Sequence, residues 1–233
     1  MALSGFNTSD KWGPWPPNSL VHGLHPGIRD ALLALGSRRG YADGQVLLAE
    51  GDCSTHAVLL VDASVKVSAT NADGRSSLLA VRHSGDLVGE MAAIDGRLRV
   101  ATVTAVGTAV VRNIPRQEFL DFLHRHPQAQ AAVSRQVVAR LREATRRRVD
   151  FAGAPVRARL CRVLAEWCEE NGRRTPCRVG LTQYELATLV GAAEVSVSRA
   201  LRSLAKDGVV RTGYRSVEIP DCIAVQAAGN GAR

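Results

Sequence analysis

The side chains best suited to chemistry in this sequence lie between residues 194 and 202. Arg199 is the strongest of them, because a guanidinium can donate two parallel hydrogen bonds to O6 and N7 of guanine. Glu194 can accept a hydrogen bond from cytosine N4 or can favour the positive end of a helix, and both roles stay open. The residues that we expect to contact DNA are Thr182, Gln183, Glu194, Val195, Ser196, Ser198, Arg199, Arg202, Tyr214 and Arg215.

A helix-turn-helix is expected to position these side chains. The apolar residues of 181–210 follow two helical periods, with Gly191 between them. Glycine suits the short turn that lets two helices cross steeply, and Thr182 with Glu185 has the spacing of a capping box. The residues expected to pack between the two helices are Leu186, Leu189, Val190, Val197, Leu201 and Leu204.

A short β-hairpin is expected directly after the two helices. Residues 209–219 read as two strands joined by a turn. They predict the wing of a winged helix, in which Arg211, Tyr214 and Arg215 can touch phosphates. An ordinary helical hairpin with a solvated face would show the same helical spacing, and the wing disfavours it.

The charge distribution also favours a polyanionic partner. The formal net charge is +8 for 233 residues, with no excess in residues 1–126 and an excess of +4 in each of 127–154 and 155–233. The surplus therefore lies in the half that carries the predicted helix-turn-helix. A solvated basic face would give the same surplus.

Several classes of protein are disfavoured by what the sequence lacks. It shows no signal peptide and no long apolar run, so we expect a cytoplasmic protein without a membrane partner. The five cysteines are scattered without a CxxC pair, which favours free thiols over disulfides or a metal site. It has no GxSxG, P-loop, HExxH or GxGxxG motif, so we expect no catalytic residues and no enzyme.

The pattern along the chain predicts an α+β fold of five segments. Short, often β-branched runs between turn signals predict a β jelly-roll barrel over 24–126. A long helical pattern follows and ends at Ala154-Pro155. The expected segments are a flexible arm at 1–23, the barrel at 24–126, a dimerisation helix and hinge at 127–154, a C-terminal winged helix-turn-helix at 155–222 and a flexible tail at 223–233.

The long helix carries the spacing of a short coiled-coil seam. Such a seam is marginal alone, so we expect the same helix of a second subunit as its partner. A twofold axis also suits winged helices that read two half-sites, although the helix could instead pack across its own barrel. The expected dimer-interface residues are Val137, Leu141, Ala144, Arg148 and Phe151.

Barrel, long helix and winged helix in this order resemble the Crp/Fnr family of bacterial transcription regulators. The resemblance runs from about Leu24 to Ile219. Its carriers are Tyr41-Ala42-Asp43-Gly44, Glu50-Gly51-Asp52, Ser84-Gly85-Asp86-Leu87-Val88-Gly89-Glu90-Met91, Arg99 and Ser198-Arg199.

This resemblance implies a phosphate-binding cassette for a cyclic nucleotide, cAMP or cGMP. Glu90 would accept from the ribose 2′-hydroxyl and Arg99 would pair with the phosphate. An iron–sulfur cluster would need cysteines near the N-terminus, and no histidine arrangement suits haem, so we expect neither. The implied cyclic-nucleotide-binding residues are Gly89, Glu90, Met91, Ala92, Arg99, Val100, Arg140 and Thr145.

The sequence departs from the family pattern at three places. Val100 replaces the usual serine or threonine, and one lost hydrogen bond to a charged acceptor costs roughly 1.5–3 kcal/mol. Ala144 and Thr145 stand where the family has a Thr-Ser pair, so one hydroxyl remains. Because Glu194-Val195 also differs from the reading helices of the family, its known half-sites cannot be carried over.

These observations predict a homodimeric, sequence-specific transcription regulator. It would read a palindromic operator in double-stranded DNA, contact RNA polymerase and sense a small effector in its barrel, with Thr145 as the expected point of coupling. The alternative is a ligand-independent architectural DNA-binding protein with a degenerate effector pocket.

Overall fold

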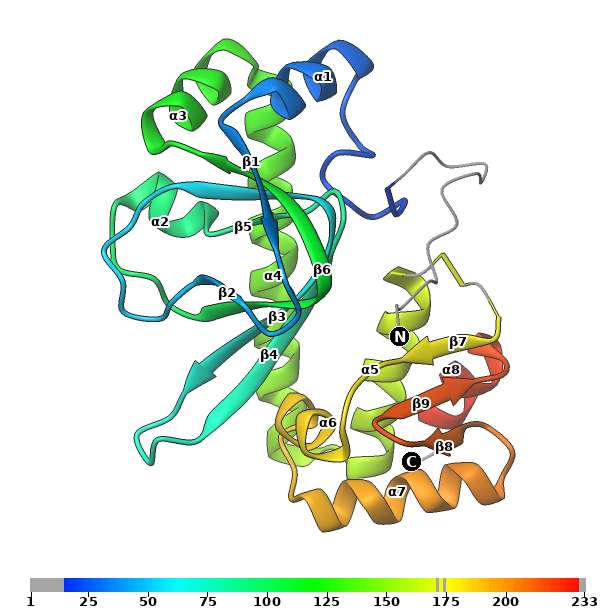
Figure 1. The fold of residues 1–233 in the computed structure, drawn as a ribbon. Coiled ribbons are helices and arrows are strands. Elements are labelled where there is room, and N and C mark those ends of the chain that lie inside the picture. Colours follow the sequence, from blue (N-terminus) through cyan, green and yellow to red (C-terminus); the bar gives the residue numbers. More distant parts are fainter. Residues whose placement is uncertain (1–14, 171, 174, 231–233) are drawn as a thin grey trace. The chain divides into compact units, whose positions relative to one another are not determined.

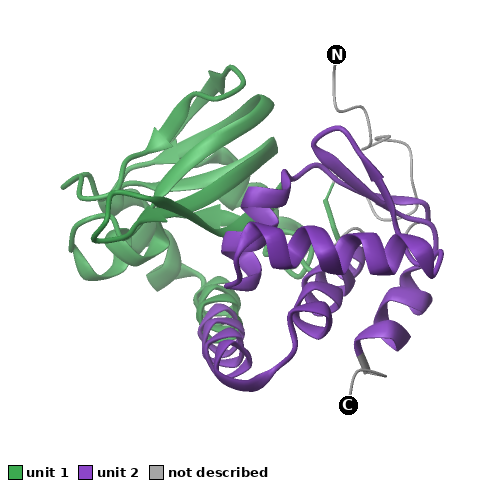
Figure 2. Cartoon of the chain, turned by 90° about the horizontal axis from the view of Figure 1, so that it is seen from below, with its two compact units in different colours: residues 1–139 green, residues 140–233 purple. Residues whose placement is uncertain are grey.

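The computed structural model describes residues 15–170, 172–173 and 175–230. The chain forms two compact units, Met1–Ala139 and Arg140–Arg233, which Figure 2 colours separately. The division falls inside the longest helix, α4 (Pro127–Gly153), so this helix contributes residues to both units.

The first unit combines an antiparallel sheet with short helices (Figure 1). Before α4, its elements in chain order are α1 (Pro26–Ala34), β1 (Ser37–Tyr41), β2 (Val46–Leu48), β3 (Ala57–Thr70), β4 (Ser76–His83), β5 (Leu87–Val88), α2 (Glu90–Asp95), β6 (Thr102–Ile114) and α3 (Arg116–Arg125).

Two long strands, β3 and β6, form the centre of this sheet. β6 pairs with β1, β2 and β3, and β3 also pairs with β4 and β5. The pairing of β3 with β6 shifts register on both sides of Asp62, and such bulges bend a strand and increase its twist. Val58, Leu60 and Val65 of β3 are fully buried in one core cluster. The predicted fold class is confirmed.

The part of the predicted N-terminal arm that the structure describes is packed against the first unit. Leu20 and Val21 are 6% and 0% exposed, and the Val21 N–H donates to the carbonyl of Gly85 at 3.0 Å. Trp15 packs against the same core, whereas Trp12 lies outside the described residues. Apolar burial therefore orders the described residues of a segment that was expected to be a flexible arm.

His83 is a buried titratable group of the first unit. It is 9% exposed, and its Nδ1 lies 3.0 Å from the Ser64 hydroxyl. Burial lowers the pKa of His83 to about 4, and the neighbouring charge of Arg82 acts in the same direction. The folded protein therefore holds this imidazole neutral at pH 7.

We expect His83 to make the first unit less stable in mild acid. The unfolded chain takes up this proton near pH 6.5 and the folded chain only near pH 4, so stability is lost as the pH falls between them. From pH 7 to pH 5 the free energy of unfolding should drop by roughly 2 kcal/mol. Urea denaturation at each pH measures it. His83→Gln should flatten this pH dependence. His124→Gln, at an exposed site, should leave it as it is in the parent protein. A His83→Gln variant with the same pH profile as the parent would contradict the assignment.

The second unit packs helices against a three-stranded sheet of order β7-β9-β8. Within the described residues of the whole chain, no helix is long and apolar enough to cross a membrane. After α4, the elements are α5 (Val156–Glu170), β7 (Cys177–Val179), α6 (Gln183–Val190), α7 (Glu194–Lys206), β8 (Arg211–Gly213), β9 (Ser216–Ile219) and α8 (Cys222–Asn230).

Two expectations about this unit are corrected. Cys168 and Cys222 form a disulfide, with their Cα atoms 5.9 Å apart, so not all five cysteines are free thiols. Residues from Cys222 to Asn230 form α8 in place of a flexible tail, and Val225 is fully buried. Sequence spacing could not reveal the pairing, because the two cysteines are 54 residues apart and meet only through the fold.

Candidate functional site

The helix-turn-helix consists of α6 and α7. The Glu185 N–H donates to Thr182 Oγ1 at 3.1 Å, and the Thr182 N–H donates to the Glu185 carboxylate at 2.8 Å, which completes the predicted capping box. α6 ends at Gly191, whose φ of 66° is left-handed and suits glycine best. The predicted apolar residues are all buried: Leu186, Leu189, Val190, Val197, Leu201 and Leu204.

Replacing Thr182 with alanine should destabilise α6 by about 1 kcal/mol, because the Glu185 N–H loses its acceptor. Hydrogen–deuterium exchange should show about fivefold less protection of the α6 amides. Thr212→Ala, at an exposed position of β8, should leave that protection unchanged. Equal protection in the Thr182 variant and the parent protein would mean that the cap contributes nothing.

One face of α7 is exposed to solvent. Val195 is 67% exposed, Glu194, Arg199 and Arg202 are also exposed, and Ser196 and Ser198 are half-buried. Among the residues that the structure describes, neither Arg199 nor Arg202 forms an ion pair with a carboxylate. These guanidiniums can therefore hydrogen-bond to a partner without breaking an internal ion pair.

The wing is the hairpin of β8 and β9, in which Thr212 pairs with Val217. Tyr214 at its tip is 90% exposed, and Arg215 beside it is exposed with a φ of 48°. Arg211 is paired with Glu218 at 2.9 Å. The tip thus offers one phenol and one guanidinium to a phosphate backbone, while part of the Arg211 charge is neutralised internally.

Two arginines of α5 hold the helix-turn-helix from behind. Arg159 donates to the carbonyls of Val190 and Gly191 at 3.1 and 2.9 Å, where α6 ends. Arg157 pairs with Asp207 at 2.7 Å, where α7 ends. Arg159 thus satisfies carbonyls at the end of α6, and Arg157 forms an ion pair with the residue that caps α7. Both helices are therefore fixed to α5 at their C-terminal ends.

Phe151, near the end of α4, packs on the turn between the two helices. A Cβ on Gly191 would lie 2.6–2.7 Å from three atoms of the Phe151 ring. The guanidinium carbon of Arg159 lies 5.6 Å from the centre of the same ring. The residue that the sequence assigns to a dimer seam thus contacts the helix-turn-helix of its own chain.

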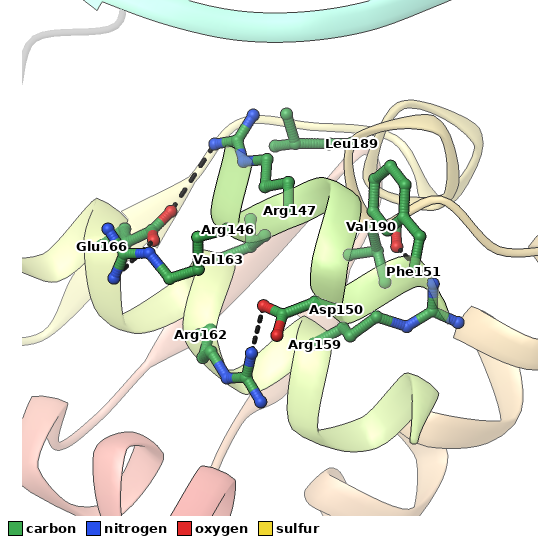
Figure 3. A pocket seen from close by; sticks show the side chains of 10 residues that line it. All are labelled: Arg146, Arg147, Asp150, Phe151, Arg159, Arg162, Val163, Glu166, Leu189 and Val190. Carbon is green, nitrogen blue, oxygen red and sulfur yellow. Dashed lines mark hydrogen bonds and ion pairs between the residues drawn. The ribbon is translucent and has the colours of Figure 1, made fainter. Parts of the chain in front are cut away.

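Figure 3 shows a small cavity between α4, α5 and α6. Its volume is about 10 Å³, room for roughly one water and not for a nucleotide. Asp150 pairs with Arg162, and Glu166 lies 3.5 Å from Arg147. Burial raises the pKa of Glu166, and the charge of Arg147 opposes this shift. These ion pairs fasten the end of α4 to α5.

Gly89 and Arg99 form the centre of a separate candidate site in the first unit, at the start of α2. Arg99 is only 4% exposed; its Nη1 donates to the carbonyl of Gly89 at 2.8 Å and its Nη2 to that of His56 at 2.6 Å. Gly89 has a φ of 73°, and a Cβ on it would lie 2.5 Å from Arg99 Nη1 and 2.7 Å from Leu48 Cδ1. The close approach of this guanidinium therefore requires glycine.

The charged groups of this site are one guanidinium and two nearby carboxylates. Burial lowers the pKa of Arg99, while the carboxylates of Asp52 and Glu90 raise it; a guanidinium remains charged nevertheless. Burial and the charge of Arg99 lower the pKa of His56. The site consequently holds one buried positive charge beside Glu90, which is 3% exposed.

The other predicted nucleotide-binding residues differ in their surroundings. Ala92 is buried, whereas Met91 and Val100 are 48% and 62% exposed. Arg140 and Thr145 lie on α4 in the second unit, whereas the cassette belongs to the first.

Comparison with known proteins identifies both units. Residues 38–126 match the cyclic nucleotide-binding domain, and residues 158–227 match the Crp-like helix-turn-helix domain. The chain is a member of the Crp/Fnr family. It is thus a DNA-binding transcription regulator with a cyclic nucleotide-binding domain, and Crp/Fnr regulators are not enzymes.

Crp/Fnr relatives align over most of the chain. The cyclic AMP receptor protein of Thermus thermophilus is 29% identical over 213 residues, 91% of this chain and 97% of the relative. A CRP-like cAMP-activated global transcriptional regulator of Mycobacterium tuberculosis is 26% identical over 206 residues, 87% of this chain and 92% of the relative. The c-di-GMP responsive regulator CLP of Xanthomonas campestris shares the fold, with a TM-score of 0.71 at 24% identity over 84% of this chain and 99% of that one.

Sequence reasoning missed several residues that build these Crp/Fnr sites. Arg157 and Arg159 support the helix-turn-helix, and Ser54 and His56 contact Arg99. Arg157 and Arg159 lie in the first turn of α5, at least 31 residues from the helix ends that they contact, so no local pattern revealed their role. Two of the acceptors of Arg99 are backbone carbonyls, of Gly89 and His56, and side-chain identity does not reveal such contacts.

Proposed function

We propose that this Crp/Fnr regulator is a homodimer that binds cAMP or cGMP in the first unit and a palindromic operator through α7 and the wing. One observation carries the nucleotide part: Arg99 is buried and held by backbone carbonyls beside a left-handed glycine at the start of α2. A guanidinium held in place at the N-terminal end of a helix is suited to a cyclic phosphate. The names of the cAMP-activated relatives support the same ligand class.

The dimer proposal is supported by the solvent exposure of the seam on α4. Leu141 and Phe151 are 65% and 46% exposed, Ala144 and Arg148 are exposed, and Val137 is half-buried. Apolar side chains with coiled-coil spacing that are exposed in a single chain are suited to pack against the same helix of a second chain. Two α7 helices related by a twofold axis would then read two half-sites.

The remaining parts of the proposal follow from the transcription role. We propose that the protein acts in the cytoplasm, contacts RNA polymerase, and couples effector to DNA through α4 at Thr145. An effector shifts such an equilibrium only by its differential affinity for two arrangements of the helix pair. The Thr182 hydroxyl also caps α6. The DNA contacts proposed are Thr182, Gln183, Glu194, Val195, Ser196, Ser198, Arg199, Arg202, Tyr214 and Arg215.

Calorimetric titration of the purified full-length protein with cAMP and cGMP tests the nucleotide proposal. We expect binding at micromolar concentrations by at least one of them, and none by 5′-AMP, which lacks the cyclic phosphate. The same nucleotide should change affinity for DNA in a parallel binding assay. Silence up to millimolar concentrations would overturn the proposal and leave a DNA binder without an effector.

Val100→Ser should tighten cyclic nucleotide binding about tenfold, because it restores a hydroxyl donor for the phosphate. The side chain at 100 is 62% exposed, so the change should leave stability intact. Val100→Ala is the matched control: it removes the same bulk without adding a hydroxyl, and its dissociation constant should equal that of the parent. Equal affinities for the serine and alanine variants would place residue 100 outside the phosphate site.

A further inference from the structure

The disulfide between α5 and α8 lies at a groove in the second unit. Cys168 and Cys222 both line this groove, which has a volume of about 220 Å³. The two residues are 1% and 6% exposed, so the remainder of each side chain is covered by α5 and α8. A small molecule that enters the groove therefore lies beside the two cysteines.

The charges around the groove restrict what can enter it. The described lining carries two carboxylates, on Glu169 and Asp221, and one guanidinium, on Arg173. Arg173 is paired with Glu169 at 3.1 Å, so its charge is largely neutralised there. The carboxylate of Asp221 directly precedes the disulfide in the chain and accepts from the Ile223 N–H at 2.8 Å. This surface should repel anions and accept neutral or cationic molecules.

We propose that Cys168–Cys222 is a thiol–disulfide exchange site for a small thiol that carries no net negative charge. A thiolate attacks one sulfur and forms a mixed disulfide, and the other cysteine leaves as a thiolate that takes a proton. A second thiol then attacks the mixed disulfide, which releases the second cysteine and a small disulfide. Two protein thiols are gained and two small thiols are oxidised, so electrons and protons balance.

The position of the bond makes its reduction consequential for the DNA-binding unit. Cys222 opens α8 three residues after Ile219, the last residue of wing strand β9. Ile219 in turn pairs with Cys177 of β7. The disulfide thus links the segment that follows the sheet to α5, and its reduction removes this covalent link between α5 and α8.

Alkylation and mass spectrometry of the protein purified without reductant test the existence of the bond. We expect three alkylated cysteines and a linked Cys168–Cys222 peptide, and five alkylated cysteines after dithiothreitol. Reduction should also lower the Tm of the DNA-binding unit by about 10 °C, since it opens a loop of 54 residues. Five alkylated cysteines even after treatment with diamide would overturn the proposal.

Two comparisons test the site further. Cys168→Ser and Cys222→Ser should each abolish the redox dependence of Tm, and Cys53→Ser, at an exposed free cysteine, should retain it. The rate at which each thiol reduces the protein is divided by the rate at which the same thiol reduces 2-hydroxyethyl disulfide, which corrects for its intrinsic reactivity. These ratios should fall in the order cysteamine, 2-mercaptoethanol, 2-mercaptoethanesulfonate. A reversed or flat order would overturn the charge selection, and a redox-dependent Tm in either serine variant would overturn the site.

Discussion

Arg199→Ala should weaken binding to the preferred operator by about 1–3 kcal/mol, roughly five- to 150-fold in affinity, and should relax specificity at one base pair. Arg199 lies on the exposed face of α7 without a carboxylate partner among the described residues, so its guanidinium can address a guanine edge. The operator is first selected from random duplexes by the parent protein. Binding is then measured at fixed salt, because phosphate contacts depend strongly on it.

Lys206→Ala provides the control for this experiment. Lys206 is exposed at the C-terminal end of the same helix, so its removal deletes a positive charge without touching the expected base-reading residues. Lys206→Ala should lower the affinity for all duplexes by a similar small factor and leave the base preference unchanged. If the alanine variant of Arg199 behaves in the same way, α7 enters the groove in another orientation.

Gly191→Ala should destabilise the DNA-binding unit by about 3 kcal/mol, through two separate effects. The left-handed φ of 66° disfavours any residue with a Cβ, and that Cβ would lie 2.6 Å from the ring of Phe151. Calorimetry measures the change, and the transition of this unit is recognised because operator DNA raises its Tm. The expected fall in Tm is more than 10 °C for a unit of this size.

The double variant Gly191→Ala with Phe151→Ala separates the two effects. Without the ring the steric clash disappears. The free energy of unfolding lost by the double variant should therefore be smaller than the sum of the losses of Phe151→Ala and Gly191→Ala. The backbone cost, about 1–2 kcal/mol, should remain. Additive losses would show that Phe151 does not restrict the turn.

The spacing of apolar residues in the sequence predicted the helices that bury one face. The spacing of Leu186, Val197 and Leu204 located the helix-turn-helix, since burial of these positions is what makes the two helices pair. Strand β1 escaped notice because Ser37–Tyr41 contains almost no apolar residue; its strand conformation comes from pairing with β6. Short strands were expected in this region, whereas Ala57–Thr70 forms one long strand, because bulges let β3 bend without ending.

The candidate sites were predictable where a side chain acts by its own type. Arg199 and Arg99 stood out because guanidiniums suit guanine and phosphate. The contact of Phe151 with the turn at Gly191 was not predicted. The position of a residue in a helix seam does not indicate what else its ring touches. The disulfide was missed for the related reason that proximity across 54 residues is a property of the tertiary fold.

The two arginines of α5 have a thermodynamic consequence for DNA recognition. Arg157 and Arg159 hold the C-terminal ends of α7 and α6, so the crossing of these helices is set before DNA is met. A preorganised binding surface loses little conformational entropy on association. The heat capacity change of binding should then reflect the area buried against the duplex alone, without the larger contribution that folding of the reading helix would add.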